Sequence, residues 1–164
     1  MQIDDWTGAT LLDHIVRVAV IFAAADGVIR PEELSIIARS AERRGLRVDP
    51  AELVHRLLEG RTPSEALDAL AAHLPPNPIV HRTLFREAIF VCLADGELAQ
   101  EEAELLVTFR ERLGLSELYG RAMQAWCQAM LSLNATGVAL IRDGDDALDD
   151  ALLDAIADLG EEQS

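Results

Sequence analysis

The sequence contains no lysine and few aromatic residues. All 14 of its basic residues are arginine, which excludes Schiff-base chemistry and the phosphate-binding lysine of a P-loop. Aromatic residues make up only 4% of the chain, although 50% of it is apolar. A hydrophobic core must therefore be built mainly from leucine, alanine, valine and isoleucine, and the abundance of alanine and leucine favours helix.

Cysteines and catalytic motifs are also scarce. Cys92 and Cys127 are the only cysteines and lie in apolar helical patterns, which predicts buried thiols rather than a disulfide. No Gly-x-Ser-x-Gly, His-Glu-x-x-His or Cys-x-x-Cys sequence occurs. One Glu-x-x-His pair is present, Glu52 and His55, but a di-iron bundle needs two such pairs and two further glutamates. We therefore expect a protein that is not an enzyme.

Positive charge is in short supply. The chain has 29 acidic and 14 basic residues and a formal net charge of −15. Such a surface repels nucleic acid and anionic membranes, and it suits cations or a protein partner with a basic surface. The first residues are acidic and Arg17 interrupts the first apolar run, so we expect neither a signal peptide nor membrane insertion. The predicted location is the cytoplasm.

Strand signals are missing, because no stretch shows sustained alternation of apolar and polar residues. Apolar residues instead recur at spacings of three and four, which predicts an all-α fold of seven to eight helices in a single domain over residues 1–164. Helix starts are marked by a capping residue before a proline at Asp49-Pro50, Thr62-Pro63 and Asn77-Pro78. The predicted helices cover residues 7–25, 31–44, 50–59, 63–73, 78–94, 99–113, 116–133 and 145–159, with a loop over 134–144. Trp126 is expected in the core.

One stretch occurs twice, as AADGVIRPEE over residues 24–33 and as LADGELAQEE over residues 93–102. The shift of 69 positions, from 26 to 95 and from 33 to 102, is constant without a gap from Arg17 and Arg86 to Leu46 and Leu115. Such self-similarity indicates an internal duplication. We expect two helix–loop–helix units related by pseudo-two-fold symmetry: repeat one over about 8–46, connecting helices over 49–74, repeat two over about 78–115, and C-terminal helices over 116–159.

The repeated Asp-Gly-x-hydrophobic-x-x-x-Glu pattern matches the second half of an EF-hand loop, in which the glycine makes a sharp turn and the glutamate binds the ion. The first and third ligand positions of such a loop are Phe22 and Ala24 in one copy and Val91 and Leu93 in the other. These side chains do not bind cations. Neither copy is therefore a working EF-hand on its own, and each supplies at most half of a site.

Two half-sites make one site if the units pack about a two-fold axis. Asp26, Glu33, Asp95 and Glu102 would then converge, and ligands that are all oxygen suit hard ions such as Ca²⁺, Mg²⁺ or Mn²⁺. A purely structural role explains the same residues, because glycine ends helices and glutamate in a first turn favours the helix dipole. The residues leave both interpretations open.

Paired A-D-G-x-(I/L)-x-x-x-E units in a small acidic helical protein resemble the TerB-like family, named for tellurite resistance. The resemblance covers about residues 8–133 and leaves out the Asp-rich segment after residue 143. It implies an all-helical domain with an acidic patch linked to metal binding, carried here by Asp26, Glu33, Asp95 and Glu102. It also implies an association with bacterial resistance to tellurite, phage and colicins.

Electrostatics limits what the resemblance implies for this chain. Tellurite is an oxyanion, and direct capture of it by a protein of charge −15 is unfavourable. We therefore expect a scaffold or a metal-dependent sensor in a stress response. The alternative is a protein-interaction module whose acidic surface binds a basic partner without metal.

Overall fold

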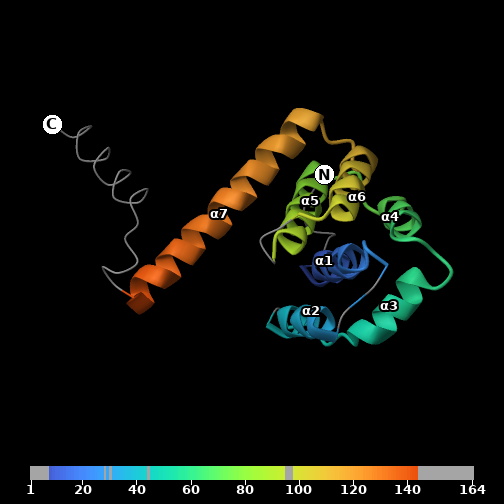
Figure 1. The fold of residues 1–164 in the computed structure, drawn as a ribbon. Helices are drawn as coiled ribbons and strands as arrows, with labels where there is room; N and C mark the ends of the chain where they lie inside the picture. Colours follow the sequence, from blue (N-terminus) through green and yellow to red (C-terminus); the bar gives the residue numbers. More distant parts are fainter. Residues whose placement is uncertain (1–7, 28, 30, 44, 95–97, 144–164) are drawn as a thin grey trace. The chain divides into compact units, whose positions relative to one another are not determined.

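The computed structural model describes residues 8–27, 29, 31–43, 45–94 and 98–143 (Figure 1). All regular secondary structure in these residues is helical, which confirms the predicted all-α class. The seven helices of the described ranges are α1 (Gly8–Ala23), α2 (Pro31–Arg43), α3 (Pro50–Leu58), α4 (Pro63–Ala71), α5 (Pro78–Cys92), α6 (Gln100–Arg112) and α7 (Glu117–Asp143). No helix in this part of the chain has both the length and the apolar character that crossing a membrane requires.

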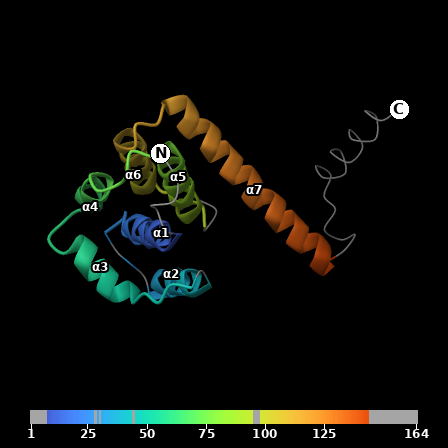
Figure 2. The ribbon, with the colours of Figure 1, turned by 180° about the vertical axis from the view of Figure 1, so that it is seen from behind.

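The chain divides into two compact units, one ending at Gln124 and the other beginning at Ala125. The first unit holds α1 to α6 and the first turns of α7. Within it, α1 packs most extensively against α5 and also contacts α2, α3 and α4, while α6 packs against α4 and α5. Both ribbon views place α1 between α5 and α2 (Figures 1 and 2). The first helix of the chain is therefore the centre of this unit.

Three helices begin at the capping residues that the sequence predicts. The Asp49 carboxylate accepts a hydrogen bond from the Ala51 N–H at 2.9 Å at the start of α3. Thr62 and Glu65 form a reciprocal capping box at α4, with distances of 3.3 Å and 2.7 Å. The Asn77 side chain caps α5 in the same way as Asp49 caps α3. Each of these residues satisfies backbone N–H groups that have no partner within the helix.

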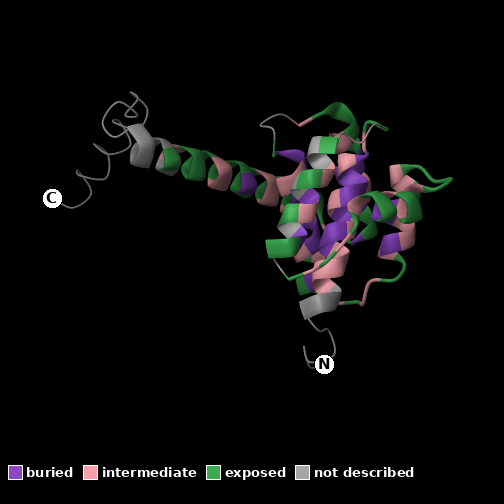
Figure 3. Ribbon diagram, turned by 90° about the horizontal axis from the view of Figure 1, so that it is seen from below, coloured by how far each residue is buried: buried purple, intermediate pink, exposed green. Residues whose placement is uncertain are grey.

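The core of the first unit is mainly aliphatic, as the composition predicts. Buried residues lie on the faces that its helices turn toward one another (Figure 3). Phe22 of α1 and Phe109 of α6 form an aromatic pair in this core, with ring centroids 5.8 Å apart. A separate buried cluster joins α1, α2 and α3 through Val16, Val20, Ile37, Ala41 and Leu53.

The two copies of the repeat share the end of their first helix and both ends of their second helix. α1 and α5 end at residues 23 and 92, and α2 and α6 span residues 31–43 and 100–112, all at the shift of 69 positions found in the sequence. After α2, the Leu46 N–H donates to the Ala41 carbonyl at 3.0 Å, and after α6 the Leu115 N–H donates to the Arg110 carbonyl at 3.0 Å. Residues 45 and 114 have φ of 81° and 67°, a conformation that glycine adopts most easily.

The structure corrects two predictions about α7. The loop predicted over residues 134–144 is wrong up to Asp143, because the helix continues to that residue. Gly137 costs a helix only about 1 kcal/mol relative to alanine, and no proline interrupts this segment. Trp126, predicted as a core residue, is 47% exposed, whereas its neighbour Cys127 is buried, as is Cys92. The helix predicted over 145–159 lies outside the described residues.

Candidate functional site

The first repeated loop follows α1 directly. Asp26 is exposed and lies in the turn after the helix, where the Gly27 N–H donates to the Ala24 carbonyl at 2.9 Å. Gly27 has φ of 80°, so the glycine of the motif makes the sharp turn that the sequence predicts. Glu33 is the third residue of α2, and its side chain lies outside the described part of the structure.

In the second loop, the structure describes only one of the two candidate carboxylates. Asp95 lies outside the described residues. Glu102 is the third residue of α6, is half-buried, and accepts a hydrogen bond from the Ala99 N–H at 3.0 Å. This is half of a capping box, because alanine has no side-chain oxygen to complete it. Glu102 therefore has a structural role as a partial cap at the start of α6.

Of the four predicted ligands, the structure describes the side chains of Asp26 and Glu102. Within the described residues, no group of three or more histidine, cysteine, aspartate or glutamate side chains could hold a metal ion. Glu101, beside Glu102, is exposed. A cation shared between the loops therefore depends on Asp95 and Glu33 as much as on the carboxylates that the structure describes.

The repeated arginines pair with carboxylates on the helices that lead into the loops. Arg17 donates to Asp13 at 2.7 Å, one turn earlier on α1. Arg86, its counterpart in the second repeat, donates to Glu87 at 2.7 Å on α5. Each of these arginines therefore has a carboxylate partner on its own helix.

The isolated Glu-x-x-His pair also has ordinary surface partners. His55 lies 3.5 Å from Glu59, and Glu52 lies 4.0 Å from Arg56, with all four side chains well exposed on or next to α3. An inward-facing metal site of the bundle type needs such residues to project into the interior. This arrangement gives no support to a di-iron centre.

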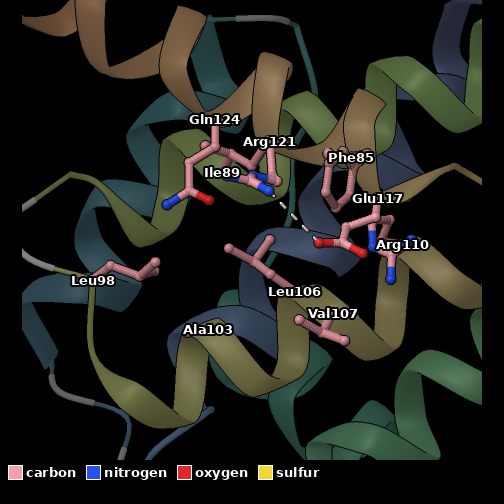
Figure 4. A pocket seen from close by; sticks show the side chains of 11 residues that line it. Phe85, Ile89, Leu98, Ala103, Leu106, Val107, Arg110, Glu117, Arg121 and Gln124 are labelled. Atoms are coloured by element: carbon pink, nitrogen blue, oxygen red, sulfur yellow. Dashed lines mark ion pairs between the residues drawn. The ribbon is translucent and has the colours of Figure 1, made fainter.

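An apolar groove that the sequence did not predict lies among α5, α6 and the first turns of α7 (Figure 4). Its volume is about 370 Å³. Phe85, Ile89 and Leu106 lie around the hollow, and Glu117 and Arg121 form an ion pair of 3.9 Å beside it. The other lining residues are Leu98, Ala103, Val107, Arg110, Gly120 and Gln124.

Gly120 fits α7 closely against α6 beside this groove. A Cβ atom at this position would lie 2.6 Å from Cδ of Arg110. Arg110 passes over the glycine and donates to the Leu115 carbonyl at 2.8 Å. The absence of a side chain at residue 120 therefore leaves room for an arginine that ties the end of α6 to the segment leading into α7.

His14 makes the free energy of unfolding depend on pH. Its side chain is 15% exposed on α1. Burial lowers the pKa of its imidazole from the usual 6.5; Asp13 opposes this, whereas Arg17 and His73 act in the same direction as burial. The unfolded chain therefore binds more protons than the folded one below about pH 6.5, and the free energy of unfolding falls as the pH is lowered through this value.

We expect His14→Gln to flatten the pH dependence of the free energy of unfolding between about pH 7.5 and pH 5.5, above the range where carboxylates titrate. Urea unfolding at a series of pH values measures this slope. The matched control is His55→Gln, since the His55 side chain is 69% exposed, and it should keep the wild-type slope. Equal slopes for wild type and His14→Gln would contradict the role of His14.

Comparison with known protein families, with curated proteins and with solved structures found no match to this chain.

Proposed function

We propose that this protein is a non-catalytic, TerB-like stress-response protein that binds a divalent cation through its two repeated loops. The ligands are the carboxylates of Asp26, Glu33, Asp95 and Glu102, and the ion is Ca²⁺, Mg²⁺ or Mn²⁺, because all the ligands are oxygen. The observation that carries this proposal is the retention of both carboxylates in two copies whose helices begin and end at equivalent residues on either side of the loop.

We further propose that the two helix–loop–helix units are related by a pseudo-two-fold axis. Three observations support this: the common shift of the helix ends, the matching hydrogen bonds after α2 and α6, and the positive φ of Gly45 and Gly114. The close packing of α1 on α5 also supports it, since these are the helices that lead into the two loops. A two-fold axis between α1 and α5 would direct both loops toward a common site.

A second candidate function is a metal-independent module in which the acidic surface binds a basic protein partner. The hydrogen bond from the Ala99 N–H to Glu102 favours this alternative, because capping of α6 explains the presence of this glutamate without a metal. The two functions differ in their response to conditions. Partner binding that survives a chelator and weakens as salt rises supports the acidic surface, whereas loss of function with the chelator supports the cation.

Isothermal titration with Ca²⁺, Mg²⁺, Mn²⁺ and Zn²⁺ tests the proposal. We expect heat of binding with at least one of the first three ions, and we expect Asp26→Asn combined with Asp95→Asn to abolish it while circular dichroism stays unchanged. The absence of heat with every ion removes the metal function. Binding that persists in the double variant assigns the cation to other residues.

A pair of single variants separates the ligand role of Glu102 from its capping role. Glu102→Gln keeps a side-chain oxygen for the Ala99 N–H, because glutamine also serves in capping boxes, but it removes the charge. Asp49→Asn is the matched control, since asparagine caps helices as well as aspartate does. We expect both variants to keep wild-type stability and only Glu102→Gln to weaken cation binding. Equal cation affinity in the two variants would mean that Glu102 caps the helix but does not bind the cation.

A further inference from the structure

In repeat one, a leucine from a third helix fills the space between the two helices of the repeat. Leu53 of α3 packs in a buried cluster with two residues of α1 and two of α2, which are Val16, Val20, Ile37 and Ala41. α3 contacts both of these helices. The side chain of Leu53 therefore completes the core of repeat one.

In repeat two, the equivalent positions line the apolar groove. At the shift of 69 positions, the four residues that surround Leu53 correspond to Phe85, Ile89, Leu106 and Arg110, and each of them lines the groove (Figure 4). The position equivalent to Leu53 is taken by Ala122, which is exposed. The groove, of about 370 Å³, therefore corresponds to the space that a leucine side chain fills in repeat one.

The walls of the groove suit a small aliphatic group. Phe85, Ile89 and Leu106 are buried and apolar. A space of a few hundred Å³ with apolar walls and a few polar groups is typical of a site for a small molecule. The equivalent space in repeat one holds an isobutyl group, so a ligand that carries a group of this size and shape matches the walls best.

Two opposite charges lie beside the groove, one turn apart on α7. Oε1 of Glu117 is 3.9 Å from Nη1 of Arg121, and the two side chains are 78% and 80% exposed. An exposed ion pair of this kind contributes little to stability. A ligand with both signs of charge can therefore replace this one pair with two new pairs at little cost, with its carboxylate on Arg121 and its ammonium group on Glu117.

The charge of the whole protein also favours a ligand without net charge. A net charge of −15 disfavours an anion, and a simple cation would be attracted to any of the many carboxylates of the chain. A zwitterion avoids the repulsion, and only a place with both signs of charge binds it at both ends. The pair of Glu117 and Arg121 beside an aliphatic space meets this requirement.

We propose that the groove binds a free aliphatic α-amino acid of the leucine type. The side chain of the ligand occupies the space that Leu53 fills in repeat one, its carboxylate pairs with Arg121, and its ammonium group pairs with Glu117. The site uses none of the proposed cation ligands. In the presence of a chelator it is therefore tested separately from cation binding.

An NMR titration of the full-length protein with L-leucine, in the presence of EDTA, tests the proposal through the methyl signals of the isoleucines. We expect a saturable shift of the Ile89 signal and no shift of the Ile37 signal, because Leu53 already fills the cluster around Ile37. Two analogues keep the side chain and lose one charge: isoamylamine lacks the carboxylate, and isocaproate lacks the ammonium group. Each should bind about threefold more weakly than leucine, as loss of one exposed ion pair implies.

Glu117→Gln tests the assignment of the ammonium group. We expect this variant to bind leucine about threefold more weakly than the wild type and to bind isocaproate as the wild type does, because isocaproate has no ammonium group. The matched control is Glu52→Gln, which removes the carboxylate of an exposed pair with the same spacing on α3, 4.0 Å from Arg56, and should bind leucine as the wild type does. Circular dichroism checks that both variants keep their helices.

Three results would overturn the proposal. The first is an Ile89 signal that does not shift with up to ~20 mM leucine, a range that includes millimolar affinity. The second is binding of isoamylamine or isocaproate as tight as that of leucine. The third is equal leucine affinity in Glu117→Gln and Glu52→Gln.

Discussion

Replacing Phe109 with alanine is expected to lower the free energy of unfolding by about 3–5 kcal/mol. Phe109 is fully buried on α6, and its ring packs against Phe22 of α1 at a centroid distance of 5.8 Å. The substitution removes a fully buried phenyl ring from the second repeat's core and leaves a cavity that neighbouring helices fill only in part. Urea unfolding followed by far-ultraviolet circular dichroism measures the loss.

Two further variants make this prediction specific to the aromatic pair. Val107→Ala lies two residues away on the same helix, where Val107 is 50% exposed, and it should change the free energy of unfolding by less than about 0.5 kcal/mol. A double-mutant cycle with Phe22→Leu and Phe109→Leu should give a coupling of about 0.5–1.5 kcal/mol. A coupling near zero would mean that the two rings contribute only through their separate burial.

Leu53→Ala is the second substitution with a large expected effect, a loss of about 2–5 kcal/mol. Leu53 is the one fully buried residue of α3 and packs in the cluster with Val16, Val20, Ile37 and Ala41. α3 has only nine residues, which is too short for a stable helix without tertiary contacts. We therefore expect the loss to appear first as local opening of α3, measured by hydrogen exchange of its amides.

The control for this prediction is Arg56→Ala on the same helix. Arg56 is 60% exposed and its closest carboxylate, Glu52, is 4.0 Å away. An exposed pair of this kind contributes little, so amide protection in α3 should remain close to that of the wild type. If Leu53→Ala and Arg56→Ala open α3 to the same extent, packing of Leu53 is not what holds the helix.

The sequence was sufficient to place most helices because their ends depend on neighbouring residues. Asp49, Thr62 and Asn77 each precede a proline and cap the helix that follows. Gly45 and Gly114 adopt the positive φ that ends the helices before them. All of these signals act over at most a few positions along the chain, which is why a reading of the sequence recovers them.

Two predictions about α7 were wrong: where the helix ends, because the local signals are weak, and whether Trp126 is buried. Gly137 resembles a helix-ending residue, yet glycine costs a helix interior only a fraction of what proline costs, and α7 passes through it. Trp126 looked like core because tryptophan is apolar and lies beside Cys127, but it is 47% exposed. The groove among α5, α6 and α7 had no sequence signal, since residues from three separate segments form it.

At the candidate cation site, too, the sequence identified some features and only the structure showed others. The repeat identified Asp26, Glu33, Asp95 and Glu102 as equivalent pairs, because a duplication is visible in residue order alone. The hydrogen bond from Ala99 to Glu102 gives one of these residues a capping role. Residue order predicted a helix-dipole role for the repeated glutamates as one of two possibilities, and only the coordinates of α6 showed the hydrogen bond to the Ala99 N–H.

The sequence by itself determined the helical class, the helix starts at capped prolines and the duplication, because each depends on residue types and on interactions between near neighbours. Tertiary structure decided that α1 lies at the centre of the first unit, that Phe22 meets Phe109, and that Trp126 and Leu133 remain exposed. Burial depends on contacts between residues far apart in the chain, and the periodicity of a single helix does not specify which face, if any, another helix covers.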